Sequence, residues 1–197
     1  MSTFIIEGGH KLKGNLEPQG AKNEALQIIC ATLLTHKDVV VENIPEIRDV
    51  LKLIEILKSL GVHVERKSKG VYVFNASTID IDFLKSPEYS KQASSLRGSI
   101  MIIGPLLARF GKGFIPQPGG DKIGRRRVDT HFIGLQKLGA TFDYDVDNHW
   151  YSVSATQLKG AYMLLDEASV TGTANIVMAA SLAIGTTTIY NAACEPY

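Results

Sequence analysis

Three similar stretches of the sequence decide its fold: "LLTHKDVVVEN" at 33–43, "LLARFGKGFIP" at 106–116 and "SLAIGTTTIYN" at 181–191. In each stretch the end of an apolar helix is followed by a polar or glycine-containing turn and then by a short strand. Their matching leucines are 73 and 75 residues apart, at Leu34, Leu107 and Leu182. Self-similarity at a nearly fixed period is typical of a chain folded from repeated units, so we expect copies of one unit.

A second match extends the first two copies. "LKSLGVHVE" at 57–65 and "LQKLGATFD" at 135–143 each read as an amphipathic helix that ends at a glycine, Gly61 or Gly139, before an alternating strand. The first of these helices carries one apolar stripe, formed by Ile47, Val50, Leu51, Ile54 and Leu57. We therefore expect this helix to cover a sheet with one face.

Each full copy then ends in a strand pair. Residues 63–76 turn at Lys69 and Gly70, and residues 141–155 turn near Asp147 and Asn148. The unit is therefore helix, strand, helix, strand, strand, and the predicted fold class is α/β.

The units extend over about 21–77, 90–156 and 166–197. The third copy stops after its first helix and strand, which leaves an apolar face without a second helix. We interpret the chain as a fragment, or as a half that requires a partner, with a truncated terminal cap as the alternative.

Composition excludes several classes of protein. With 21 Lys and Arg against 20 Asp and Glu, the net charge of +1 gives no global field for nucleic acid or an anionic membrane. Two cysteines make no disulfide framework, no signal-peptide core is present, and the longest apolar run is too short to span a bilayer, so we predict a cytoplasmic protein. The five histidines have no metal-binding spacing, and no metal is expected.

Polar helix starts occur in the copies, and a helix start offers free N–H groups and a positive dipole end to an anion. Lys22 and Asn23 stand at the first start. Three serines surround Arg97 in the sequence: Ser94, Ser95 and Ser99. They suggest a polar opening above the buried, apolar part of the helix. A solvated lysine and a snorkelling or ion-paired arginine are the competing interpretations.

The second copy also contains "PGGDKIGRRRVDTH" at 118–131. Its glycines allow a loop to approach phosphate oxygens closely, beside the three arginines at 125–127. One or two of these arginines are expected to bind a ligand, and the rest to be solvated or paired with Asp129. Because the run lacks interleaved aromatic residues, nucleic acid is a poor explanation for it. His131 is interpreted as a helix residue with a satisfied hydrogen bond.

The third start is "EASVTGTANIVMAA" at 167–180, where the hydroxyls at 169, 171 and 173 can cap the helix and also face a ligand. Capping is the simpler role. Polar starts in three copies of one unit lead to the hypothesis that they converge on one anionic ligand.

Four stretches together resemble the enolpyruvyl transferase family: "GAKNEAL" at 20–26, the 118–131 stretch, "LQKLGAT" at 135–141 and "SVTGTANIVMAASLAIGTTTIYNAACEP" at 169–196. The resemblance runs over essentially the whole chain. Within the family it points to the N-terminal half of the UDP-N-acetylglucosamine 1-carboxyvinyltransferase type.

The resemblance implies an inside-out α/β fold of repeated units. It also implies transfer of the enolpyruvyl group of phosphoenolpyruvate to the 3-hydroxyl of UDP-N-acetylglucosamine, with release of phosphate and no organic cofactor, in peptidoglycan precursor synthesis. Residues 1–20 are expected to form a strand and linker that pack with the missing half, and residues 21–197 the repeat domain. No nucleic acid or membrane partner is expected.

The resemblance also assigns site residues by position. Lys22, Arg97 and Arg126 are expected to neutralise phosphate and carboxylate charge, and Asn23 to contact the sugar. The nucleotide-sugar site is expected to be lined by Arg126, Arg127, Val128, Asp129, Thr130, Glu167, Ala168, Ser169 and Val170. Glu167 stands where some relatives carry a lysine.

Asp121 stands where many members of the family carry a cysteine that protonates the enol methylene and is alkylated by the epoxide fosfomycin. A carboxylic acid can deliver a proton but is a much poorer soft nucleophile than a thiolate, so we predict insensitivity to the epoxide. A free aspartate is protonated only about one part in a thousand at pH 7. The acid role therefore needs burial, or the charge of bound phosphoenolpyruvate, to raise the pKa of Asp121.

Members of the family are much longer than this chain, and further active-site residues are expected in the missing half. The resemblance therefore implies that the isolated chain is catalytically inert and at best a weak nucleotide-sugar binder. The alternative function is a stand-alone binding module for a nucleotide sugar or another phosphate ligand.

Overall fold

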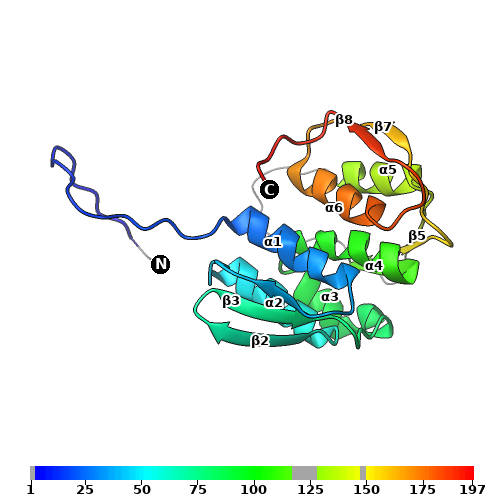
Figure 1. Ribbon diagram of the computed structural model, residues 1–197, viewed down its shortest axis with the longest axis horizontal. Helices are drawn as coiled ribbons and strands as arrows, with labels where there is room; N and C mark the ends of the chain where they lie inside the picture. The colour runs from blue at the N-terminus through cyan, green and yellow to red at the C-terminus, as the bar shows by residue number, and fades with distance from the viewer. Residues whose placement is uncertain (1–2, 117–127, 147–149) are drawn as a thin grey trace.

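The structure is a computed structural model that describes residues 3–116, 128–146 and 150–197. Residues 3–20 extend away from the folded body as an arm without helix or strand (Figure 1). Its apolar side chains are almost fully exposed, among them Phe4, Ile5 and Leu12. The packing of this arm with the missing half of the protein stays a prediction.

The first unit contains the five elements predicted from the repeat. They are α1 (Lys22–Ala31), β1 (Val39–Val41), α2 (Arg48–Ser59), β2 (His63–Ser68) and β3 (Val71–Asn75), with a short 3₁₀ helix η1 (Thr32–Leu34) after α1. The strands form an antiparallel sheet in the order β1-β3-β2. The hairpin turns at Gly70, which has a φ of 71°, as the sequence predicts.

The second unit has the same order of elements and the same sheet topology. A 3₁₀ helix η3 (Arg97–Ile102) runs into α4 (Ile103–Phe110), followed by β4 (Lys112–Pro116), α5 (Asp129–Lys137), β5 (Thr141–Asp145) and β6 (Trp150–Ser154). Its sheet is antiparallel in the order β4-β6-β5, so each strand has its counterpart in the first unit. Asp147 and Asn148, where the sequence predicts the turn, lie outside the described residues.

The third unit contributes α6 (Val170–Ala180) and β8 (Thr188–Tyr190). A strand that the sequence analysis missed, β7 (Tyr162–Leu164), pairs with β8 in parallel. Also missed were η2 (Asp82–Lys85) and α3 (Pro87–Ala93), which connect the first two units. A signal for α3 exists, because Ser86 caps its start by accepting from the Tyr89 N–H and Pro87 occupies its first turn.

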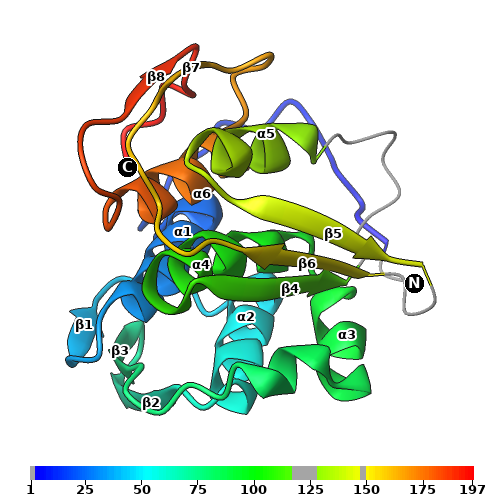
Figure 2. The same cartoon turned by 90° about the vertical axis from the view of Figure 1, so that its right-hand side faces the viewer.

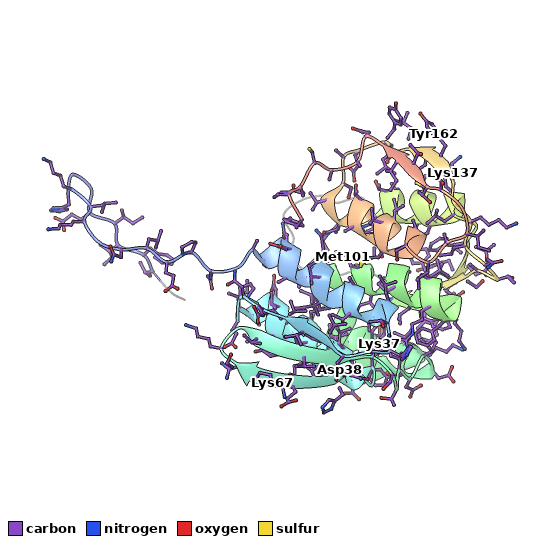
Figure 3. The ribbon with its side chains drawn as sticks, in the orientation of Figure 1. Lys37, Asp38, Lys67, Met101, Lys137 and Tyr162 are labelled. Carbon is purple, nitrogen blue, oxygen red and sulfur yellow. The ribbon has the colours of Figure 1, made fainter. Side chains whose placement is uncertain are left out.

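The helices form the interior and the sheets lie on the outside. Helix α6 packs against α4, α5 and α1, and in Figure 2 the sheet of β4, β5 and β6 faces the viewer with α4 and α6 behind it. Met101, 1% exposed, lies among these helices (Figure 3). Within the described ranges, no helix combines the length and apolar composition needed to cross a bilayer.

The predicted stripe on α2 is confirmed except at one position. Four of its residues are buried or packed against the core: Ile47, Val50, Ile54 and Leu57. Leu51 is 39% exposed, whereas Leu53 and Ile56 are buried. The reason is that α2 packs against both α1 and α3, so a wider arc of the helix is buried than one sheet would cover.

The glycines that end α2 and α5 have the predicted left-handed conformation. Gly61 has a φ of 98° and Gly139 a φ of 100°. A Cβ on Gly61 would also lie 2.3 Å from the carbonyl oxygen of Thr78, so this position has no space for a side chain.

Candidate functional site

The starts of α5 and α6 are joined through a buried threonine. The Thr130 hydroxyl lies 3.2 Å from Asp166 Oδ1 and 3.3 Å from Glu167 Oε1, and donates to these carboxylates. Thr130 is 1% exposed, so its side chain holds the two segments together. The structure thereby brings together the two stretches expected to line a nucleotide-sugar site, 128–130 and 167–170.

Ser169 caps α6 as the sequence predicts. Its side-chain oxygen accepts from the Gly172 N–H at 3.2 Å. The first N–H groups of a helix have no partner within it, and at α6 these belong to Val170 and Thr171. Ala168 is exposed just before the cap, so the helix start is open to a ligand.

A second contact between α5 and α6 runs through His131. Its Nε2 lies 3.3 Å from Thr171 Oγ1, and its Nδ1 lies 3.0 Å from Asn175 Nδ2. His131 and Asn175 are both buried. The interpretation of His131 as a helix residue with satisfied hydrogen bonds is confirmed.

Arg97 is the first residue of η3, and η3 lies between α1 and the α5–α6 pair. The next residue, Gly98, is adjacent to α1, because a Cβ built on it would lie 3.2 Å from Leu26 Cδ1. On the other side, burial and then the positive charge of Arg97 lower the pKa of His131 to about 4. The 3₁₀ helix that Arg97 begins, η3, also packs against α6.

The serines around Arg97 do not form the polar opening that the sequence suggested. The hydroxyls of Ser94, Ser95 and Ser99 each donate to a backbone carbonyl in α3, at Lys91, Gln92 and Ala93 respectively. They close the end of α3 because the last carbonyls of a helix lack partners within it.

Lys22 is the first residue of α1, where its ammonium group is paired with a carboxylate. Lys22 Nζ lies 2.9 Å from Asp49 Oδ2 in the first turn of α2, and the side chains are 47% and 41% exposed. An exposed pair of this kind contributes about 1 kcal/mol or less. It leaves Lys22 able to exchange Asp49 for an anionic ligand.

Asn23 is exposed at the same helix start, next to Tyr197. Partial burial and the charge of Glu195 raise the pKa of the Tyr197 hydroxyl, and a hydrogen bond with the Asn23 side chain opposes that shift. In Figure 1, α1 and α6 begin on the same side of the molecule, near the label of the C-terminus.

Three of the expected site residues, Asp121, Arg126 and Arg127, lie outside the described residues. Val128 precedes α5 and accepts from the His131 N–H through its carbonyl. Asp129 begins α5. No group of three or more His, Cys, Asp or Glu residues suited to a metal ion occurs within the part of the chain that the structure describes.

Two residues of this region were not expected to interact with site residues. Asp49 pairs with Lys22 across 27 residues, and Asn175 contacts His131 across 44 residues. A signal for Asn175 was present, since it is an amide within an otherwise apolar helix and such a buried group needs partners.

The comparisons with known proteins agree with this geometry. A family model described as EPSP synthase (3-phosphoshikimate 1-carboxyvinyltransferase) matches residues 6–197. The UDP-N-acetylglucosamine 1-carboxyvinyltransferase of Bacteroides thetaiotaomicron is 61% identical over 197 residues, 100% of this chain and 45% of the relative. The one of Porphyromonas gingivalis is 58% identical over the same shares. The chain thus spans less than half the length of these curated relatives.

Two solved structures share the fold. The enolpyruvyl transferase NikO from Streptomyces tendae aligns with a TM-score of 0.74 at 19% identity, over 92% of this chain and 41% of that one. EPSP synthase from Acinetobacter baumannii aligns with a TM-score of 0.64 at 22% identity, over 93% and 41%. These likenesses confirm the predicted α/β repeat fold.

Proposed function

The chain belongs to the EPSP synthase family, and from this premise we propose that it is the N-terminal part of a UDP-N-acetylglucosamine 1-carboxyvinyltransferase. The observation that carries the proposal is 61% identity to such an enzyme over all 197 residues. The proposed reaction is the first committed step of peptidoglycan precursor synthesis, in the cytoplasm.

In this reaction the 3-hydroxyl oxygen of UDP-N-acetylglucosamine bonds to C2 of phosphoenolpyruvate and gives up its proton to a base, while C3 takes up a proton from an acid of the site. C3 then loses a proton as the C2–O bond to phosphate breaks, which restores the double bond and releases phosphate. We assign the proton donation to Asp121. Lys22, Arg97 and Arg126 neutralise the carboxylate and phosphate charges, a form of electrostatic stabilisation suited to a phosphate leaving group.

The nucleotide-sugar side of the site is proposed to lie at the starts of α5 and α6. The contact of Thr130 with Glu167 supports this, because it holds 128–130 beside 167–170. The open N–H groups at the α6 start suit a phosphate group of the ligand. Asn23 is proposed to contact the sugar from the start of α1.

We propose that the rest of the active site comes from a C-terminal half. The relatives are more than twice as long as the matched region. An apolar groove between α1 and α6, with Ile28 42% and Val177 52% exposed along it, and the exposed apolar side chains of residues 3–20 are surfaces for such packing.

The test is phosphate release from phosphoenolpyruvate and UDP-N-acetylglucosamine. The chain alone is expected to release none, and the chain co-expressed with the C-terminal portion of the Bacteroides thetaiotaomicron relative is expected to release it. Asp121→Asn in the same assembly should abolish release. Turnover by the chain alone, or full turnover by the Asp121→Asn assembly, would contradict the proposal.

A further inference from the structure

The side-chain amide of Asn175 joins two backbone groups at the junction of η3 and α4. A continuous α-helix would join the Gly104 N–H to the Ile100 carbonyl directly. Here Asn175 Oδ1 accepts from the Gly104 N–H at 2.8 Å, and Asn175 Nδ2 donates to the Ile100 carbonyl at 3.2 Å. Because an N–H only donates and a carbonyl only accepts, the amide has a single orientation.

Gly104 makes this insertion possible. A Cβ at position 104 would lie 2.4 Å from both the backbone oxygen and Oδ1 of Asn175, which is closer than non-bonded atoms approach. Asn175 is fully buried, with an exposed fraction of 0%. The amide is therefore held firmly, and its second N–H has a fixed direction.

That second N–H determines the tautomer of His131. Asn175 Nδ2 lies 3.0 Å from His131 Nδ1, so Nδ1 must accept the hydrogen bond. A neutral imidazole that accepts at Nδ1 carries its proton on Nε2. His131 is 3% exposed, and burial together with the charge of Arg97 lowers its pKa to about 4, in keeping with a neutral ring at pH 7.

The Nε2–H of His131 in turn directs the hydroxyl of Thr171. Nε2 donates to Thr171 Oγ1 at 3.3 Å, so the hydroxyl proton points elsewhere. Among the described residues, this proton has no protein acceptor within hydrogen-bond distance. Thr171 is partly exposed in the first turn of α6, next to Val170 and Ser169.

We propose that Asn175 and His131 are positioning residues that present the Thr171 hydroxyl as a hydrogen-bond donor to the nucleotide sugar. The inference rests on the proposed function for the identity of the ligand. It adds a donor contributed by Thr171, outside the residues that the family resemblance assigns. A hydrogen bond from a hydroxyl to a charged phosphate oxygen is the contact expected there, at a helix start that already favours anions.

Two measurements test this inference. Calorimetric titration with UDP-N-acetylglucosamine compares the parent with Thr171→Val, which keeps the shape and removes the donor, and with Thr171→Ser, which restores the donor. Thr141→Val on β5 is the matched control. We expect Thr171→Val to bind about tenfold more weakly, as for a lost hydrogen bond to a charged group, and the other two variants to bind like the parent.

The second measurement is the imidazole nitrogen NMR spectrum of the unliganded parent at pH 7, with His131→Gln to assign the signal among the five histidines. We expect the Nε2–H tautomer. An Nδ1–H or cationic ring overturns the inference without the use of any ligand. Parent-like binding by Thr171→Val, or equally weak binding by Thr171→Ser, overturns it and leaves the proposed function standing. A parent that binds no nucleotide sugar even when it is assembled with the C-terminal portion of the Bacteroides thetaiotaomicron relative overturns both.

Discussion

Asn43 and Asn191 have the same left-handed backbone conformation, with a φ of 57° at each residue. They occupy the same place in the stretches 33–43 and 181–191, shortly after β1 and directly after β8. A non-glycine residue at positive φ is uncommon, and asparagine tolerates this conformation better than most. The first and third units therefore share backbone geometry as well as element order.

Replacement of Asn43 tests this turn. Asn43→Ala is expected to lower the free energy of unfolding by about 1 kcal/mol, because alanine is strained at positive φ, whereas Asn43→Gly should stay close to the parent. Urea denaturation measures both, with Asn15→Ala in the exposed arm as control. If Asn43→Gly lost as much stability as Asn43→Ala, the loss would have to come from a side-chain contact and the strain argument would be wrong.

The loop before α2 predicts a pH dependence of stability. Glu46 accepts from Arg66 Nε at 2.7 Å, from the Gly70 N–H at 3.1 Å and from the Tyr72 hydroxyl at 3.0 Å. The hydrogen bond from Arg66, followed by the one from Gly70, lowers the pKa of Glu46 to about 2. These contacts favour the ionised carboxylate.

The sign of the effect follows from linkage. The folded-state pKa is depressed, so the stabilisation is fully present above the unfolded-state pKa of about 4.3 and is lost as the pH falls toward 2. Glu46→Gln should therefore have a shallower fall in stability between about pH 4.5 and 2 than the parent. Glu42→Gln, an exposed carboxylate nearby, is the control. Identical pH profiles for parent and Glu46→Gln would refute the assignment.

Because Asp49 pairs with Lys22, removal of the Asp49 carboxylate is predicted to increase the affinity of the chain for an anionic ligand. Asp49→Asn removes the carboxylate that competes for the Lys22 ammonium group, and exposed pairs are worth up to about 1 kcal/mol. We therefore expect UDP-N-acetylglucosamine or phosphoenolpyruvate to bind up to about fivefold more tightly to Asp49→Asn. Lys22→Ala should bind more weakly, and Asp49→Asn should have no effect in the Lys22→Ala background. A gain that persists without Lys22 would rule out this competition.

The carboxyl group at position 121 predicts resistance to epoxide alkylation. In the assembled enzyme, mass spectrometry should detect no fosfomycin adduct on the parent, because a carboxylate is a poor soft nucleophile. Asp121→Cys should gain the adduct, because a thiolate attacks the epoxide. An adduct on Asp121 of the active parent would contradict this.

Local chemistry made much of the fold predictable from the sequence. Gly61, Gly70 and Gly139 mark helix ends and a hairpin turn, where backbone conformation depends on the residue itself. The buried face of α2 was less predictable, because Leu53 and Ile56 are buried outside the predicted stripe. Helix α2 also packs against α3, whose start is recognisable only from Ser86 and Pro87.

The site was harder to predict, because its contacts join residues far apart in the sequence. No local pattern pairs Lys22 with Asp49, or His131 with Asn175. The serines beside Arg97 looked like a ligand-binding group, but a hydroxyl near a helix end satisfies free carbonyls equally well. Which of the two roles applies depends on tertiary structure.

Helix starts from successive units are proposed to act together on one anionic ligand. Calorimetric titration of the chain with UDP-N-acetylglucosamine tests it most directly, in the parent and in Lys22→Ala, Arg97→Ala and Arg126→Ala. Lys37→Ala, beyond the opposite end of α1, is the control (Figure 3). We predict weaker binding for each of the three site variants, about tenfold for a lost charge-assisted contact, and unchanged binding for Lys37→Ala. Three site variants with the affinity of the parent would show that these helix starts do not converge on the ligand.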